Sequence, residues 1–289
     1  MTISPNWRSE NKHLQILEAA EKGKYGVIAA IAYNIEQIIG LVDAAKKARS
    51  PLILQFFPWA ITFGDGILIK TAAEAVRNCD VPISIHLDHA QNEELIKKAM
   101  QLPFDSIMVD MSHYEKEENL AKTARLVKLC HERGIATEAE PGRIEGGEDG
   151  VMDTEGLEGS KTTPEEAEEF VATGVDALAP AFGNVHGEYG KIGPQLDFAR
   201  LSQLRKVLNG RVRLALHGTN GFMPELMKQC IAAGMNKINV NRLVLDDYYE
   251  HLYATVEKVP HTTLMEQGVQ QVVDLTVSWM NICGSAGQA

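Results

Sequence analysis

The stretch Ile83-Ser84-Ile85-His86-Leu87-Asp88-His89 decides how the rest of the chain is interpreted. Its apolar and polar residues alternate, which predicts a β-strand. Asn92 then offers a helix cap, and residues 93–100 have a helical pattern. Asp88 and His89 therefore lie where a strand gives way to a helix, the edge at which parallel α/β proteins place catalytic groups. Taken alone, the stretch is explained as well by a buried structural histidine and a helix-flanking aspartate.

Seven other apolar segments resemble this strand, and helical patterns separate most of them. The near-continuous apolar strands indicate a parallel sheet buried on both faces. Eight strand–helix units most often close into a (β/α)8 TIM barrel, with a doubly wound open sheet as the alternative. The eight predicted strands are residues 26–32, 51–56, 83–89, 106–110, 135–140, 176–180, 211–217 and 237–241. The predicted helices include residues 12–22, 34–49, 67–78, 93–100, 117–133 and 164–173.

No linker rich in Pro, Gly or Ser divides the chain, so the sequence predicts a single TIM-barrel domain over residues 1–289. We place its barrel core at about 23–250 and a C-terminal helical tail at 251–289. Residues 264–282 have apolar side chains at helical spacing but no place among eight barrel units. They are expected to pack outside the barrel or on a neighbouring subunit.

Composition excludes several classes of protein. The 289 residues are 45% apolar with a net charge of −11, which argues against nucleic-acid binding. An anionic substrate would need local positive charge, a metal or helix N-termini. Four scattered cysteines without a CxxC pair indicate reduced thiols, and the polar first ten residues do not resemble a signal peptide. No apolar run reaches about 18 residues, so we expect a cytoplasmic protein without a membrane span.

Three histidines follow strand ends on this map. His89 ends the third strand, His186 follows the sixth and His217 ends the seventh, so all three are expected at one mouth of a barrel. Three imidazoles with one open position are typical of a catalytic zinc site. Individually, His186 could belong to a glycine-rich loop and His217 could flank a helix. The histidines interpreted as structural are His13, His86, His113, His131, His251 and His261.

Carboxylates gather at the same predicted mouth. Glu138 and Glu140 share one face of the fifth strand. They are interpreted either as a polar layer inside the barrel, paired with Lys or Arg, or as an alternate or structural metal site. The polar loop at 141–150 is long enough to be a lid that brings Glu148 over the substrate, or else an acidic loop without that role. Glycine loops at 183–187 and 217–221 are suited to bind an anion such as phosphate.

These segments resemble the class II, zinc-dependent ketose-bisphosphate aldolases, which include the fructose- and tagatose-bisphosphate aldolases. The resemblance extends from about Gly23 to Gly287. Its motifs are Ala-Tyr-Asn at 32–34, His-Leu-Asp-His at 86–89, Val-Asp-Met-Ser-His at 109–113, Glu-Ala-Glu-Pro-Gly at 138–142, Gly-Asn-Val-His-Gly at 183–187, Leu-His-Gly at 216–218 and Lys-Ile-Asn-Val at 237–240.

The resemblance implies a role for each matching residue. His89, His186 and His217 would bind zinc, and Asp110 and Glu140 match positions reached by a second or displaced metal. Asp88 would transfer the proton of the hydroxyl at the cleaved bond. Glu148 would be the acid/base that transfers a proton at the carbanion carbon. The matched substrate-binding residues are Asn34, Gly187, Lys191, Gly218 and Asn239. A monovalent cation (Na⁺ or K⁺) often binds beside the positions of Gly187, Gly218 and Asn239. The implied reaction is glycolytic cleavage of a phosphorylated ketose, fructose bisphosphate first, into dihydroxyacetone phosphate and an aldehyde, by a homodimer or homotetramer.

The phosphate-binding positions depart from the family pattern. Thr219-Asn220-Gly221 stands where the family has Gly-Ser-Gly, Asn241-Arg242 replaces an acidic residue or Ala followed by Thr, and Phe57 replaces a Ser. Asn220, Asn241 and Arg242 are nevertheless expected to contact the substrate. Arg242 could supply charge-assisted hydrogen bonds in place of the missing hydroxyl, or it could be a surface arginine that opens a helix. The alternatives are therefore a tagatose bisphosphate aldolase, a barrel zinc hydrolase (although the first strand lacks the usual His-x-His pair) and a non-catalytic metal-binding relative.

Overall fold

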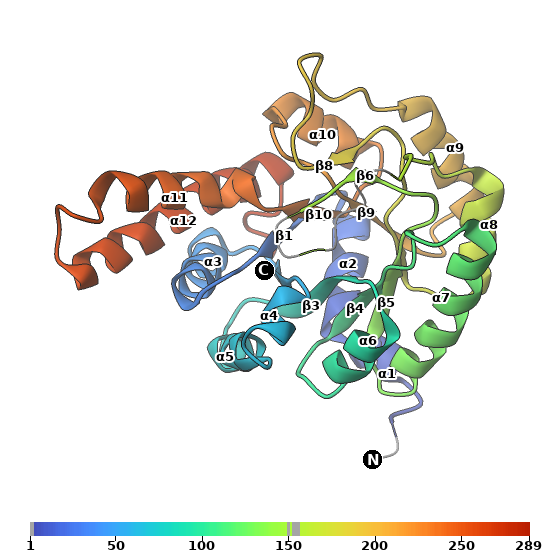
Figure 1. Cartoon of the computed structure of the whole chain (residues 1–289), viewed down its shortest axis with the longest axis horizontal. Coiled ribbons are helices and arrows are strands. Elements are labelled where there is room, and N and C mark those ends of the chain that lie inside the picture. Colours follow the sequence, from blue (N-terminus) through green and yellow to red (C-terminus); the bar gives the residue numbers. More distant parts are fainter. Residues whose placement is uncertain (1–2, 149–150, 152–156) are drawn as a thin grey trace.

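The computed structural model describes residues 3–148, 151 and 157–289 (Figure 1). Within them, eight parallel strands close into a barrel in the order β1-β10-β9-β7-β5-β4-β3-β2, which confirms the predicted (β/α)8 architecture. The barrel strands are β1 (Val27–Ile31), β2 (Leu52–Phe56), β3 (Ile83–Ala90), β4 (Ser106–Val109), β5 (Ala136–Ala139), β7 (Ala177–Leu178), β9 (Arg213–Leu216) and β10 (Lys237–Val240).

Helices surround the barrel and bury their apolar faces against it (Figure 1). Asn34 and Asn92 cap two of them, since their side-chain oxygens accept hydrogen bonds from Gln37 N and Leu95 N at 2.9 Å each. The helices are α1 (Trp7–Glu10), α2 (Lys12–Gly23), α3 (Ile35–Ala48), α4 (Trp59–Thr62), α5 (Ile67–Val76), α6 (Glu93–Ala99), α7 (Lys116–His131), α8 (Pro164–Ala172), α9 (Phe198–Leu208), α10 (Pro224–Ala232), α11 (Arg242–Thr255) and α12 (His261–Cys283).

Helix α2 packs beneath the barrel and closes its amino-terminal end. Its buried Ile16 and Leu17 cluster with Val27 and Ile53 from the strands. His13 on the same helix reaches inward, with Nδ1 3.0 Å from Ser84 Oγ. Because this end is filled with side chains, a ligand has access to the barrel interior from the opposite end, where the strands finish.

Two parts of the structure differ from the sequence-based assignment. The sixth strand is shorter than predicted, with only Ala177–Leu178 in the barrel, and helix α9 was not predicted. The loop after β5 contains β6 (Glu145–Gly146), which pairs in parallel with β8 (Val185–His186) outside the barrel. Asp149 and Gly150 of that loop lie outside the described residues.

The C-terminal segment forms a helical arm. Helix α12 lies against α11 and α3, and Figure 1 shows α11 and α12 extending together away from the barrel. Packing outside the barrel, one of the two expected placements, is therefore confirmed. Helix α11 continues to Thr255, so the boundary predicted at residue 250 falls inside a helix.

No helix in the described part of the chain is both long and apolar enough to span a membrane.

Candidate active site

A local irregularity of β3 positions Asp88 and His89. Its pairing with β4 runs Leu87↔Ile107 and then Ala90↔Val109, so β3 carries one extra residue between these pairs. His89 takes up this bulge with a left-handed φ of 51°. Bulges beside active sites re-aim side chains, and here both Asp88 and His89 line the cavity at the barrel mouth.

The short β6–β8 pair joins the loop of His186 to the loop of Glu148. Gly146 is opposite His186 in the parallel register. Its φ is 93°, and a Cβ built there would lie 2.2 Å from the carbonyl oxygen of His186. Only glycine fits without a shift of backbone, because both the conformation and the space exclude a side chain. The pairing therefore fixes His186 and brings Glu148 to the same mouth.

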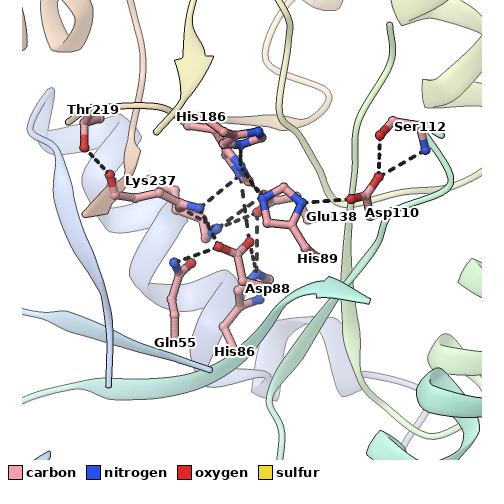
Figure 2. Close-up of polar contacts among 12 residues, drawn as sticks. Gln55, His86, Asp88, His89, Asp110, Ser112, Glu138, His186, Thr219 and Lys237 are labelled. Atoms are coloured by element: carbon pink, nitrogen blue, oxygen red, sulfur yellow. Dashed lines mark hydrogen bonds and ion pairs between the residues drawn. The ribbon is translucent and has the colours of Figure 1, made fainter. Parts of the chain in front are cut away.

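The three predicted zinc histidines converge, and Figure 2 labels two of them, His89 and His186. His217 Nδ1 lies 3.2 Å from His89 Nε2 and 3.3 Å from His186 Nε2. Potential ligand atoms of these three residues and of Glu140 all lie within 4.8 Å of one another, and all four residues are buried. Three imidazole nitrogens and one carboxylate oxygen thus surround a common point.

The hydrogen bonds behind these imidazoles fit a metal centre. His89 Nδ1 lies 2.8 Å from Asp110 Oδ2, and His217 Nε2 lies 2.8 Å from Glu138 Oε1. Each carboxylate accepts a hydrogen bond from the N–H group at that ring position. The other ring nitrogens, His89 Nε2 and His217 Nδ1, therefore carry lone pairs that a metal could bind. Nitrogens bound at about 2.0–2.1 Å to a tetrahedral zinc stand roughly 3.3–3.4 Å apart, close to the spacing observed.

Glu140 also fits a metal-binding role. Its Oε2 is buried and has no hydrogen-bond partner among the described residues. Burial, together with the nearby carboxylate of Asp110, raises the pKa of Glu140 to about 8. A cation at the histidine cluster would remove the cost of burying this carboxylate as an anion.

Two amides hold one oxygen of the Asp88 carboxylate, and the other oxygen, Oδ1, makes no hydrogen bond within the described chain. Asp88 Oδ2 accepts hydrogen bonds from Asn239 Nδ2 at 2.9 Å and from Gln55 Nε2 at 3.2 Å. Burial raises the pKa of Asp88, but neighbouring His89 and Lys237 outweigh burial and hold that pKa well below its usual range. The carboxylate is thus fixed and ionised.

Close to Asp88, a buried ion pair between Lys237 and Glu138 supports the site (Figure 2). Lys237 Nζ lies 3.0 Å from Glu138 Oε2, and both side chains are fully buried. Burial raises the pKa of Glu138, yet the Lys237 charge and the His217 hydrogen bond lower it further than burial raises it. The polar layer paired with Lys, one of the two interpretations of Glu138, is what the structure contains.

A cavity of about 330 Å³ opens above these groups. It brings together eleven residues that the sequence singled out, from five separate segments of the chain. They are Asp88, His89, Glu148, His186, Gly187, His217, Gly218, Asn220, Asn239, Asn241 and Arg242. Glu148 is half-buried, and its Oε2 accepts a hydrogen bond from Asn241 Nδ2 at 2.9 Å.

Three other predicted site residues lie elsewhere. The Asn34 amide is used by the α3 cap and by a hydrogen bond to Tyr248 Oη at 2.9 Å, and Asn34 does not line the cavity. Lys191 is exposed and is not a lining residue. Asp110 stands behind His89, because Ser112 holds its Oδ1 through N and Oγ at 3.0 and 2.7 Å.

Several lining residues were not singled out by sequence analysis. Tyr33 and Tyr249 form part of the wall, and Glu188 lies at the mouth. Glu188 could have been found from its position directly after the His186-Gly187 pair. Tyr33 belongs to the Ala-Tyr-Asn motif at 32–34 but was assigned no role, and Tyr249, within α11, carried no such signal.

Comparisons with known proteins agree with this geometry. The family profile "Fructose-bisphosphate aldolase class-II" matches residues 11–288. A Coccidioides immitis protein described as a candidate fructose-bisphosphate aldolase is 48% identical, over 96% of this chain and 95% of the relative. The crystal structure from that organism superposes with a TM-score of 0.95 at 49% identity, covering 96% of this chain and 98% of the other.

Two more distant proteins are also aldolases by name. Fructose-bisphosphate aldolase of Geobacillus stearothermophilus is 38% identical over 78% of this chain and 79% of the relative. The YdjI aldolase of Escherichia coli K12 superposes with a TM-score of 0.83 at 29% identity, covering 95% and 97% of the two chains. A match over nearly the whole chain, together with a buried histidine cluster at the barrel mouth, makes this protein an enzyme, an aldolase that belongs to the metal-dependent class II fructose-bisphosphate aldolase family.

Proposed function

We propose that this chain is a zinc-dependent aldolase that reversibly cleaves a phosphorylated ketose, first of all fructose bisphosphate, into dihydroxyacetone phosphate and an aldehyde. The observation that carries the proposal is that three converging imidazoles and the carboxylate side chain of Asp88 line one cavity. The hydrolase and the non-catalytic alternatives are less well supported, because the named relatives are aldolases.

Zinc is the metal that fits these donors best. His89, His186 and His217 would hold it, and Glu140 would supply a carboxylate oxygen. Imidazole nitrogen with carboxylate oxygen at tetrahedral spacing suits zinc better than the all-oxygen ligands that magnesium and calcium prefer. When bound, the metal would stabilise the negative charge that develops on the ketone oxygen as the carbon–carbon bond breaks.

Asp88 is the proposed base for cleavage. Its carboxylate would take the proton from the hydroxyl group next to the bond that breaks. That bond's electron pair then passes to the ketone fragment, and the hydroxyl carbon leaves as the aldehyde. The Asn239 and Gln55 amides hold Oδ2, so the carboxylate does not have to reorient between substrates.

Glu148 is the proposed acid for the ketone fragment. After cleavage, that fragment is an enediolate, which requires one proton on carbon to become dihydroxyacetone phosphate. Glu148 reaches the cavity from the loop after β6, and its contact with Asn241 places it at the wall. Both proton transfers reverse in the direction of synthesis.

Phosphate binding is assigned to the rim of the cavity. Arg242, Asn220 and Asn241 line it, next to the backbone of Gly187 and Gly218 and the side chain of Asn239. Lys191 is a weaker candidate because it is exposed outside the lining, and Asn34 is a weaker one because the helix cap uses its side chain. A monovalent cation beside these loops remains part of the proposal.

We further propose that the chain forms one domain and assembles as a homodimer or homotetramer in the cytoplasm. The helical arm supports assembly, since Tyr253 and Val256 expose 87% and 58% of their surface near the end of α11. Light scattering with size-exclusion chromatography tests this. A monomeric mass at micromolar concentration would contradict it.

The decisive test is product formation by metal-loaded protein. Fructose bisphosphate and tagatose bisphosphate are supplied separately, and dihydroxyacetone phosphate is measured by its enzymatic reduction. We expect release from fructose bisphosphate that stops after chelation and returns with zinc. Full activity in metal-free protein, or no release from any phosphorylated ketose, would overturn the proposal.

A further inference from the structure

Glu188 connects two loops at the rim of the cavity. Its Oε1 accepts a hydrogen bond from Asn220 Nδ2 at 2.8 Å and another from Arg242 Nη1 at 2.8 Å. Asn220 follows β9, and Arg242 begins α11 after β10. All three residues line the cavity. One carboxylate oxygen thus collects two converging donors, which is the arrangement that an oxygen of a bound anion would require.

Arg242 supplies positive charge at a cavity that carboxylates also line. Among the lining residues in the described part of the chain it is the one lysine or arginine, whereas Asp88, Glu148 and Glu188 contribute carboxylates. Its Nε is also bound, at 2.8 Å, to Asp246 one turn along α11, outside the lining. A substrate anion that approaches Arg242 from the cavity therefore meets a guanidinium group already engaged by Glu188.

The contact is weak enough to be exchanged. The side chains of Arg242 and Glu188 are 56% and 73% exposed, and ion pairs between exposed side chains contribute little free energy. A phosphate dianion carries more charge than a carboxylate and forms strong hydrogen bonds to an arginine fork. An uncharged ligand has no group that could displace Glu188. A ligand with a single carboxylate would exchange one carboxylate contact for another of the same charge, with no gain in free energy.

We propose that the Glu188 carboxylate competes with the substrate phosphate for the phosphate's binding site. The carboxylate occupies the anion seat formed by Asn220 and Arg242, and a substrate phosphate binds there by displacing it. This inference deepens the proposed function, on which it rests for the class of substrate. Glu188 therefore lowers the affinity of the seat for a phosphate monoester and does not affect the binding of an uncharged ligand.

The test measures binding of dihydroxyacetone phosphate and of uncharged dihydroxyacetone to metal-loaded protein by calorimetry. Glu188→Gln keeps the size of the side chain but removes the competing charge. We expect this replacement to lower the Kd for dihydroxyacetone phosphate about two- to fivefold and to leave the Kd for dihydroxyacetone unchanged. In Arg242→Ala, which lacks the seat's cation, the same replacement should give no gain.

Asp246→Asn is the matched control. It removes the other carboxylate from the same arginine without opening Nη1 to the cavity, so the affinity should change by less than about twofold. Three results would overturn the inference: no change in Glu188→Gln, weaker binding in Glu188→Gln, or an equal gain in the Arg242→Ala background. Weaker binding would mean that Glu188 positions Arg242, and an equal gain would mean general repulsion.

Binding is read without turnover, which separates this inference from the proposed function. A chain that shows the expected pattern but cleaves no ketose bisphosphate would overturn the substrate assignment and leave the displacement of Glu188 in place. Cleavage of fructose bisphosphate together with no effect of Glu188→Gln on binding would support the substrate assignment and overturn the displacement of Glu188.

Discussion

Glu138 accepts a hydrogen bond from His217, with Oε1 2.8 Å from Nε2, and this leaves Nδ1 of the same imidazole facing His89 and His186. The carboxylate thereby selects which nitrogen is available to a metal. Its other oxygen lies 3.0 Å from Lys237 Nζ, so one buried side chain orients a ligand and neutralises an ammonium group.

Glu138→Gln is expected to weaken zinc binding by about 10–100-fold, since partners behind metal ligands typically contribute that much. Competition with a chromogenic chelator measures this. The variant should also unfold at a lower temperature, because Lys237 loses its buried counter-charge. Glu165→Gln, an exposed carboxylate on α8, is the control. Wild-type affinity in Glu138→Gln would show that His217 does not need this partner.

Asp88→Asn should retain zinc but lose about 10²- to 10⁴-fold in kcat, the usual contribution of a general acid–base group. The amide keeps the shape of the side chain and cannot accept the hydroxyl proton as a carboxylate does. Zinc content and turnover are measured on the same preparation. If turnover is unchanged while zinc is retained, the proton carrier is another residue, and Glu148→Gln becomes the next variant to assay.

Gly146→Ala should lower kcat, because its Cβ would collide with the His186 carbonyl oxygen and loosen the β6–β8 pair. Gly190→Ala is a matched control on the same side of the barrel, since nothing lies within 4 Å of a Cβ built there. Steady-state kinetics on both variants, with zinc content determined, makes the comparison. Equal activities would mean that the β6–β8 pair does not position the catalytic groups.

The largely buried carboxylate of Asp176 is expected to make the free energy of unfolding depend on pH. Burial raises the pKa of Asp176, but hydrogen bonds from His131 and Thr137 and the charge of Arg8 outweigh burial and leave that pKa below its usual value. A carboxyl whose pKa is lowered by folding stabilises the protein above its unfolded pKa of about 3.9, and this stabilisation is lost as the pH falls through the folded value.

Asp176→Asn should therefore cost about 1.5–3 kcal/mol of unfolding free energy at pH 7, as expected for a hydrogen bond to a charged group. The difference from wild type should persist at pH 5 and shrink as the pH falls below about 4. Urea titrations at several pH values provide the measurement. A difference that grows on acidification would contradict the assigned sign.

Much of this protein was determined by the sequence alone. Strand and helix periods are local properties, so the eight strands, the capping roles of Asn34 and Asn92 and the barrel class followed from the pattern of residues. The position of His89 and His217 at strand ends was equally local, and parallel strands place such ends at one mouth.

Only the tertiary structure decided which atoms meet. The bulge at Asp88 and His89, the β6–β8 pair and the Glu188–Arg242 contact all join segments that are distant in sequence, and no local pattern encodes such pairings. For the same reason Lys191 and Asn34, which matched family positions, proved to lie outside the cavity lining, whereas Glu188 lines it. Sequence periodicity fixes which face a residue occupies, but packing between segments fixes the few ångströms on which binding and proton transfer depend.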